Sequence, residues 1–147
     1  MEHRIGIAAP ATRVWEVLAD LEGWAAWNPL HPKAEGRLSI GAPLAVELHV
    51  PGDAPTTQRV SVIDWVPNEQ IVWAARYGGG FMRSTRYMEI EALSEAGCVF
   101  SNGEIFAGLG ARFAPKSLRA RTRQGLVAMS EALKARAEAR VGAAAAA

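Results

Sequence analysis

The chain has 147 residues, half of them hydrophobic, and its 16 basic side chains nearly balance its 15 acidic ones. A chain of this length buries roughly 70% of its unfolded surface on folding, so a single domain needs no disulfide or metal for stability. Its one cysteine, Cys98, excludes an internal disulfide and any metal site built from several cysteines.

The first part of the chain predicts one strand followed by two short helices. Apolar alternation at residues 5–7 indicates a strand that ends before Pro10. From Ala11 the apolar residues recur every three or four positions, which predicts an amphipathic helix with Pro10 in its first turn. Residues 20–28 predict a second short helix, which the pair Asn28-Pro29 ends.

Residues 33–107 predict six further strands in an antiparallel meander. Alternating or β-branched apolar residues mark the strands, and turns rich in glycine and proline separate them. The last two strands, within residues 81–93 and 98–107, are joined by a tight turn at residues 94–97 and therefore predict a hairpin.

The sequence after Gly110 is helical in composition. Apolar residues at spacings of three and four predict a helix from about Pro115 to Arg140, which would be ~39 Å long. We expect residues 1–141 to form a single domain and the alanine-rich tail, residues 142–147, to be disordered. The order of elements predicts an α+β fold, in which a seven-stranded curved antiparallel sheet surrounds the long C-terminal helix.

The opening stretch APATRVWEVLADLEGWAAWNPL, residues 9–30, resembles the signature of the SRPBCC superfamily of START-like, helix-grip proteins. Its nearest branch is that of the polyketide cyclases/dehydrases and lipid-transport proteins. The later stretches GCVFSNGEIFAGL and LKARAEA are also similar, and the resemblance covers residues 3–140. It implies the helix-grip fold and an elongated apolar cavity between sheet and terminal helix. Members bind lipids, sterols, plant hormones, polyketides or aromatic amines, and only some are cyclases or dehydratases, so the resemblance fixes no reaction.

Arg86 and Glu104 are the candidate polar pair of this cavity. Glu89 and Glu91 lie on the same face of their strand, which would face solvent. Arg86 lies on the opposite face and would therefore point toward the concave side of the sheet. Pairing across the hairpin turn places Arg86 opposite Ile105, with the register fixed to within one residue. Glu104 would then lie beside Arg86. The pair would either bind an oxygen of an apolar ligand or form a buried salt bridge without a ligand role.

The tryptophans are the second group of candidates, because five of them against two tyrosines is a large aromatic content for a chain of this size. Trp24 and Trp27 lie on the second short helix and Trp73 on a central strand, where they would either line the cavity or pack the core. Gly125, central on the apolar stripe of the last helix, suggests close approach of a ligand or a strand. The full set of candidate cavity residues is Trp24, Trp27, Trp73, Arg86, Met88, Asn102, Glu104, Phe106, Gly125 and Met129.

The resemblance, together with these residues, implies three classes of function. The preferred one is binding of a hydrophobic small molecule, lipid-, polyketide- or aromatic-like, between the sheet and the C-terminal helix. A cyclase- or dehydratase-type enzyme is the alternative, with Arg86 polarising a carbonyl and Glu104 as general acid or base. A protein-interaction module is the third class, which an exposed apolar patch over a filled core would favour.

Several other partners have little support in the sequence. The three histidines are isolated and no nucleotide-binding glycine motif occurs, so we expect no metal site and no cofactor. Residues 111–147 carry eight basic and two acidic side chains, which could meet nucleic acid or anionic lipid, but we favour a solvated helix face and expect no nucleic acid. Without a long apolar run or a signal peptide, we expect a cytoplasmic protein that is not integral to a membrane, and a homodimer is left open.

Overall fold

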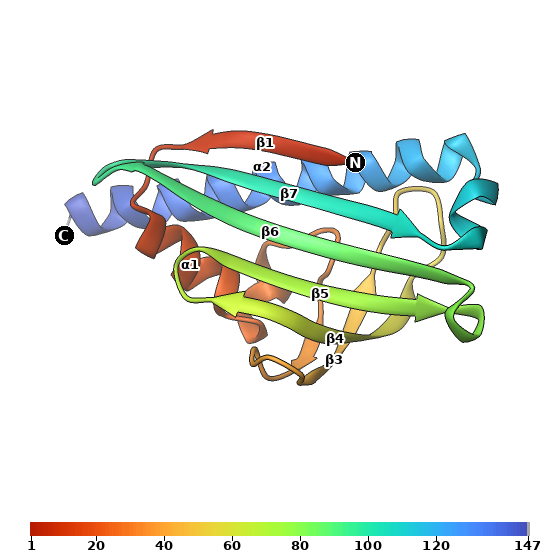
Figure 1. Cartoon of the computed structure of the whole chain (residues 1–147). Coiled ribbons are helices and arrows are strands. Elements are labelled where there is room, and N and C mark those ends of the chain that lie inside the picture. The colour runs from red at the N-terminus through yellow and green to blue at the C-terminus, as the bar shows by residue number, and fades with distance from the viewer. Residues whose placement is uncertain (147) are drawn as a thin grey trace.

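The computed structural model describes residues 1–146, which form one antiparallel sheet covered on one face by helices (Figure 1). The seven strands follow the spatial order β1-β7-β6-β5-β4-β3-β2. Their bounds are β1 Glu2–Ile7, β2 Ala34–Gly36, β3 Pro43–Leu48, β4 Thr56–Val66, β5 Gln70–Tyr77, β6 Met82–Ser94 and β7 Gly97–Ala107. The predicted strand count and the antiparallel meander are confirmed.

Two short helices separate β1 from β2, as predicted. The first is the α-helix α1, Ala11–Ala19, which starts directly after Pro10. The second, η1, Glu22–Ala26, is a short 3-10 helix. Two further 3-10 segments, η2 (Gly78–Gly80) and η3 (Leu109–Phe113), lie at the ends of β5 and β7.

The long helix α2 spans Lys116–Ala146 and runs behind β1 and β7, with α1 beside its C-terminal half (Figure 1). It extends past the predicted end near Arg140 and includes residues 142–146 of the tail that we expected to be disordered. Alanine has the highest helix propensity of all residues, so this composition favours continuation of the helix. Ala147 lies outside the described residues. Within residues 1–146, no helix combines the length and apolar composition that a membrane crossing requires.

In the β6–β7 hairpin the side chains point to the predicted faces of the sheet, but the register differs from the predicted one by one residue. Ser94 pairs with Gly97 at the turn, but a bulge between Ala92 and Ser94 shifts the pairs that follow. As a result Arg86 is paired directly with Glu104 rather than with Ile105.

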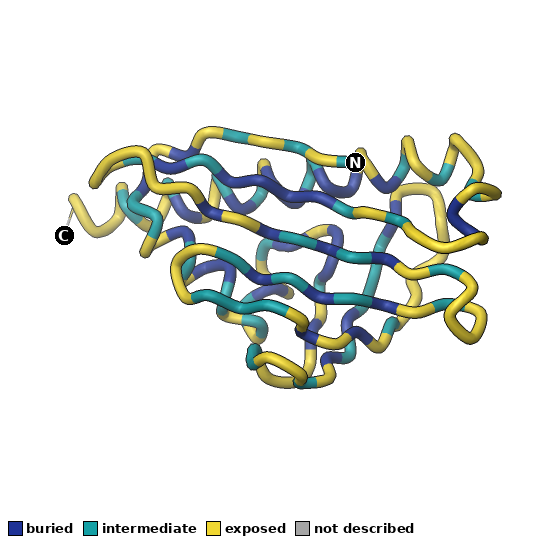
Figure 2. The backbone as a smooth tube through the Cα atoms, in the orientation of Figure 1, coloured by how far each residue is buried: buried dark blue, intermediate teal, exposed yellow. Residues whose placement is uncertain are grey.

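The core lies between the inner face of the sheet and the apolar stripe of α2. Buried residues alternate with half-buried or exposed ones along the central strands, and the two ends of the sheet are exposed (Figure 2). On α2 the fully buried apolar side chains recur at helical spacing; they are Leu126, Met129, Leu133 and Ala137. This packing seals the half of the molecule near α1, so an internal space remains toward the other end.

Candidate functional site

A cavity of about 140 Å³ lies between the sheet and the N-terminal half of α2. Most of its wall is apolar, formed by Leu30, Leu48, Val50, Met82, Phe106 and Leu118. An engineered protein cavity of about this volume accepts one benzene ring. The space therefore suits one ring, or the end of a longer apolar molecule.

Five polar residues complete the wall of this cavity: Gln58, Tyr77, Arg86, Glu104 and Thr122. They come from β4, β5, β6, β7 and α2, so four strands and the long helix contribute one polar residue each. A mainly apolar pocket with a few convergent polar groups is the usual form of a small-molecule site.

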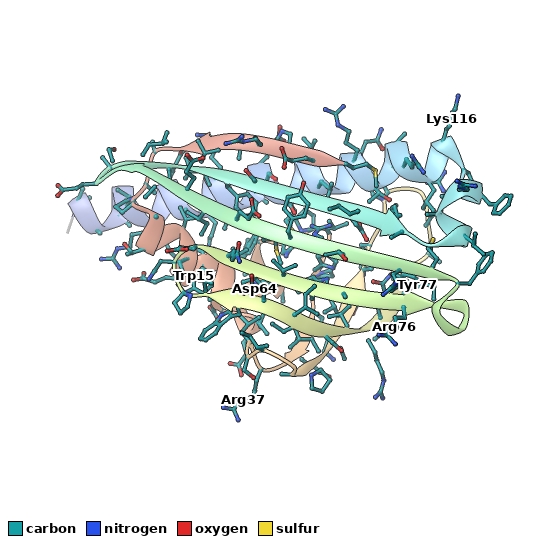
Figure 3. The ribbon with its side chains drawn as sticks, in the orientation of Figure 1. Trp15, Arg37, Asp64, Arg76, Tyr77 and Lys116 are labelled. Carbon is teal, nitrogen blue, oxygen red and sulfur yellow. The ribbon has the colours of Figure 1, made fainter. Side chains whose placement is uncertain are left out.

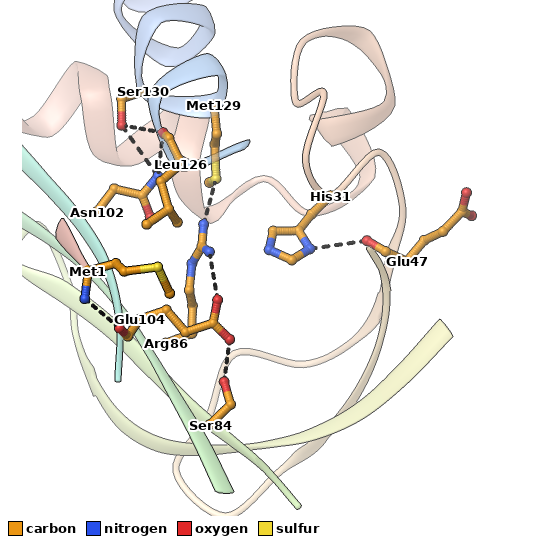
Figure 4. Close-up of polar contacts among 10 residues, drawn as sticks. All are labelled: Met1, His31, Glu47, Ser84, Arg86, Asn102, Glu104, Leu126, Met129 and Ser130. Carbon is orange, nitrogen blue, oxygen red and sulfur yellow. Dashed lines mark hydrogen bonds and ion pairs between the residues drawn. The ribbon is translucent and has the colours of Figure 1, made fainter. Parts of the chain in front are cut away.

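Arg86 is the most unusual of these polar groups. Its side chain is 2% exposed, yet no oxygen within residues 1–146 accepts a hydrogen bond from its guanidinium; the dashed line from Arg86 to Glu104 in Figure 4 marks an ion pair. Its Nη2 donates to the Met129 sulfur at 3.3 Å, a weak acceptor, and its Nε has no partner. A guanidinium offers five N–H donors, and a buried donor without an acceptor is costly.

Glu104 is the counter-ion of Arg86. The two residues are cross-strand partners, and Glu104 Oε2 lies 3.7 Å from Arg86 Nη1. This distance allows electrostatic attraction but exceeds that of a hydrogen bond. The other carboxylate oxygen, Oε1, accepts a hydrogen bond from the Ser84 hydroxyl, and the side chain of Glu104 is 13% exposed. The carboxylate is therefore anchored on one side and open toward the cavity on the other.

The electrostatics of the pocket follow from burial. Burial lowers the pKa of Arg86 to about 10, although the nearby Glu104 carboxylate acts in the opposite direction, so Arg86 remains cationic at neutral pH. Burial and Glu104 raise the pKa of Tyr77 to about 12, against a hydrogen bond with Gln58. Tyr77 is thus a neutral phenol that can donate a hydrogen bond.

His31 is a buried residue beside this site that the sequence analysis did not select. Its Nδ1 lies 3.1 Å from the Glu47 carbonyl oxygen, which can only accept, so Nδ1 carries the proton and Nε2 a free lone pair. Nε2 is buried without a partner, on the side of the ring that faces Arg86 (Figure 4). Burial, and then the charge of Arg86, lower the pKa of His31 well below its usual value. The histidine is therefore neutral.

None of the three candidate tryptophans lines the cavity: Trp24 and Trp73 lie in the packed core, and Trp27 is half-buried against it. Trp24 is fully buried, and its indole Nε1 donates to the Leu18 carbonyl at 2.9 Å. Its ring lies 6.1 Å from that of Trp73 and 6.2 Å from that of Trp27. Together with His31, these rings fill the space next to η1 on the inner side of the sheet.

The other candidates divide between the cavity and the α2 contact. Phe106 lines the cavity together with Arg86 and Glu104, whereas Met88 is buried in the core. Asn102 does not reach the cavity, because its Nδ2 donates to the Leu126 carbonyl and the Ser130 hydroxyl of α2.

Met129 and Gly125 are the two candidates on α2. Met129 contacts Arg86 through its sulfur but does not line the cavity. Gly125 lies against Leu30, because an added Cβ would lie 2.6 Å from Leu30 Cδ1. The close approach at this glycine is therefore by a side chain of the protein.

Three polar residues of the wall, Gln58, Tyr77 and Thr122, are absent from the set of cavity residues predicted from the sequence. Gln58 has the parity of the buried Val60 and Val62, and Thr122 belongs to the predicted apolar stripe of α2. A polar residue in an otherwise apolar face was the available signal for Gln58 and Thr122.

No group of three histidine, cysteine or acidic side chains within residues 1–146 could bind a metal ion. Cys98 is buried, and burial raises the pKa of its thiol, which disfavours the reactive thiolate.

The sequence profile of the family described as polyketide cyclase/dehydrase and lipid transport matches residues 1–138, nearly the whole chain. The chain belongs to this family. No curated protein matches the sequence.

Several solved structures have the same fold. The Zhui aromatase/cyclase from Streptomyces sp. R1128 aligns at 23% identity and a TM-score of 0.68, over 96% of this chain and 94% of its own. A norcoclaurine synthase from Thalictrum flavum aligns at 18% identity and a TM-score of 0.66, over 93% and 92% of the two chains. The two-domain aromatase/cyclase StfQ, of the steffimycin biosynthetic pathway, aligns at 17% identity and a TM-score of 0.71.

This chain is 97% covered in the StfQ alignment but spans only 46% of StfQ, about half of that protein. At these identities the likeness shows a shared helix-grip fold. The expected fold class is therefore confirmed, and the family is the one described as polyketide cyclase/dehydrase and lipid transport.

Proposed function

We propose that the protein binds a small, mainly apolar molecule and that Arg86 receives a carbonyl or carboxylate oxygen of it. The observation that carries this proposal is the guanidinium of Arg86, which is buried in the wall of an apolar cavity without a hydrogen bond to any oxygen of residues 1–146. A ligand oxygen would supply the missing acceptor, and a carboxylate could accept two N–H groups at once.

The dimensions of the cavity narrow the ligand class. At about 140 Å³ the cavity admits one ring, so a monocyclic aromatic acid or ketone fits, as does the ring or chain end of a larger molecule. Tyr77, as a neutral phenol, would donate a further hydrogen bond to such an oxygen. The apolar wall would contact the remainder of the ligand.

Titration with three probes of similar ring size tests this proposal. Benzoate and acetophenone carry an acceptor oxygen and toluene does not, so we expect the first two to bind more tightly to the unmodified chain. Binding can be followed by isothermal titration calorimetry. Arg86→Met should remove the preference for the oxygen-bearing probes, whereas the exposed Arg4→Met is the matched control and should retain it. An unchanged preference in Arg86→Met would exclude Arg86 as the anchor.

A second candidate function is a cyclase- or dehydratase-type reaction, favoured by the position of Glu104 in the same wall as Arg86. Arg86 would bind the carbonyl oxygen of a ketone and stabilise the enolate that forms. The Glu104 carboxylate would remove the proton from the adjacent carbon and return it to the product.

Hydrogen exchange of acetophenone in D₂O tests this chemistry without knowledge of the natural substrate. Removal and return of a proton at the methyl carbon replaces hydrogen by deuterium, and proton NMR detects the loss of the methyl signal. The unmodified chain should accelerate the exchange and Glu104→Gln should not. Equal rates with both proteins would leave ligand binding as the function and eliminate the enzymatic role.

A further inference from the structure

An exposed apolar and basic surface occupies the end of the molecule where η2 and η3 meet. Phe81 is 53% exposed, Leu109 66% and Phe113 78%. The two turns are in contact, because the Gly110 N–H donates to the Phe81 carbonyl at 3.1 Å. We call this surface the basic end; its residues are Phe81, Leu109, Phe113, Arg76, Arg83, Arg112, Lys116 and Arg119.

The five basic residues of the basic end have no acidic partner inside the described part of the protein. None of them forms a salt bridge with a carboxylate of residues 1–146, whereas Arg4, Arg13 and Lys134 each form one elsewhere on the surface. Residues 105–130 contain no acidic residue at all. The positive charge of this end is therefore left for an external anion to neutralise.

Two of these charges are placed directly against each other. Arg76 on β5 and Arg83 on β6 are cross-strand partners, and both are exposed. Like charges in this position repel, which lowers the stability of the strand pair. Figure 3 shows Arg76 at this end of the sheet and Lys116 at the start of α2, at the same end of the molecule. Arg119 is fixed nearby, since its Nη2 donates to the Ala111 carbonyl of η3 at 3.1 Å.

We propose that the basic end docks on the surface of an anionic lipid bilayer. Apolar side chains that project from turns can insert among lipid acyl chains, while surrounding lysine and arginine side chains bind the headgroup phosphates. Two adjacent turns carry the exposed side chains Phe81, Leu109 and Phe113. A fluid bilayer can accept such separate side chains without a partner surface of matching shape. A bilayer therefore matches both the apolar and the charged part of this surface.

The basic end also borders the cavity. Tyr77 and Met82, which line the cavity, flank the η2 turn that carries Phe81. Docking would thus place this end of the cavity at the membrane, where apolar molecules concentrate. The docking itself does not depend on the proposed ligand, so the two proposals succeed or fail separately.

Co-sedimentation of the full chain with lipid vesicles tests the docking. One set of vesicles contains phosphatidylcholine alone, and the other equal parts of phosphatidylcholine and phosphatidylglycerol. We expect binding to the anionic vesicles, weak binding to the neutral ones, and a decrease at high salt, because salt screens the charges.

Variants locate the binding surface. Phe113→Ser should lower the affinity for anionic vesicles by about tenfold or more, the equivalent of losing one buried phenylalanine, and Arg83→Glu should also weaken binding. Leu93→Ser is the matched control for the apolar variant, because Leu93 is 66% exposed near the end of β6, beside the β6–β7 turn at the opposite end of the molecule. Arg136→Glu, near the other end of α2, is the control for charge. Both controls should bind as the unmodified chain does.

Several outcomes would overturn the proposal. One is the absence of binding to anionic vesicles. Another is an equal loss of vesicle binding in the variants and in their controls, which would indicate attraction by net charge alone. Binding to polyglutamate but not to vesicles would indicate an acidic protein as the partner. A dimer that Phe113→Ser dissociates and Leu93→Ser does not, seen by analytical ultracentrifugation, would assign the surface to a second copy of the chain.

Discussion

Replacement of Arg86 by methionine should stabilise the protein while it removes ligand binding. Burial lowers the pKa of Arg86 from its ordinary value to about 10 even with Glu104 nearby. When the pKa of a base is lower in the folded state than in the unfolded state, its charged form lowers the free energy of unfolding. At about 1.4 kcal/mol per pKa unit, this reduction at neutral pH is about 3 kcal/mol.

Methionine is chosen because it is unbranched and flexible and can fill the volume of the arginine stem. Arg86→Ala would instead leave a void beside Met129 and confound the comparison. We expect Arg86→Met to raise the free energy of unfolding by roughly 1–3 kcal/mol, because it removes the desolvated charge while the remaining Glu104 is 13% exposed and keeps its hydrogen bond from Ser84. For a domain of this size, the melting temperature should rise by about 2–4 °C per kcal/mol.

Urea denaturation followed by circular dichroism measures this change, and differential scanning calorimetry checks the melting temperature. Arg4→Met serves as the control, since Arg4 is exposed and its loss should change stability by less than about 1 kcal/mol. The reasoning would be refuted by a loss of 2 kcal/mol or more in Arg86→Met, because Arg86 would then stabilise the fold through its ion pair.

Three further predictions concern the neighbours of Arg86. Glu104→Gln should lower the free energy of unfolding by about 2 kcal/mol or more in urea denaturation, because it leaves the buried Arg86 charge without its counter-ion; unchanged stability would contradict the ion pair. His31 is neutral in the folded state, and its folded pKa lies below its unfolded value near 6.5, so the unfolded state binds the proton first as the pH falls. Stability should therefore decrease below about pH 6.5, by up to about 1.4 kcal/mol per pH unit, and His31→Gln should show a shallower slope; identical slopes would show that other groups cause the loss. Gly125→Ala should push Leu30 toward the cavity and so weaken benzoate binding in calorimetric titration. The stability of the protein should change little, because the higher helix propensity of alanine, worth roughly 1 kcal/mol, offsets the strain of the new contact. Unchanged affinity for benzoate would show that the cavity does not depend on Leu30.

The polar pair of the site could be predicted from the sequence, because it depends on local rules. Strand parity placed Arg86 on the inner face, and the short turn at residues 94–97 fixed the hairpin register to within one residue. The remaining shift comes from the bulge next to Ser94, for which the sequence carries no glycine or proline signal.

The extent of the cavity could not be predicted in the same way, since it depends on which side chains fill the space inside the grip. Trp24 and Trp73 were equally compatible with lining a cavity and with packing a core, and their position is decided by contacts with each other and with His31. His31 itself is fixed by the Glu47 carbonyl on β3, a contact that no spacing in the sequence reveals.

A crystal structure of the protein with 4-bromobenzoate tests the central claim most directly, because the anomalous signal of bromine fixes the orientation of the probe. We predict that the probe occupies the cavity with its carboxylate oxygens about 3 Å from the Arg86 guanidinium nitrogens and with its bromine directed away from them. A cavity that stays empty at saturating probe, or a probe whose carboxylate has no contact with Arg86, would contradict the account.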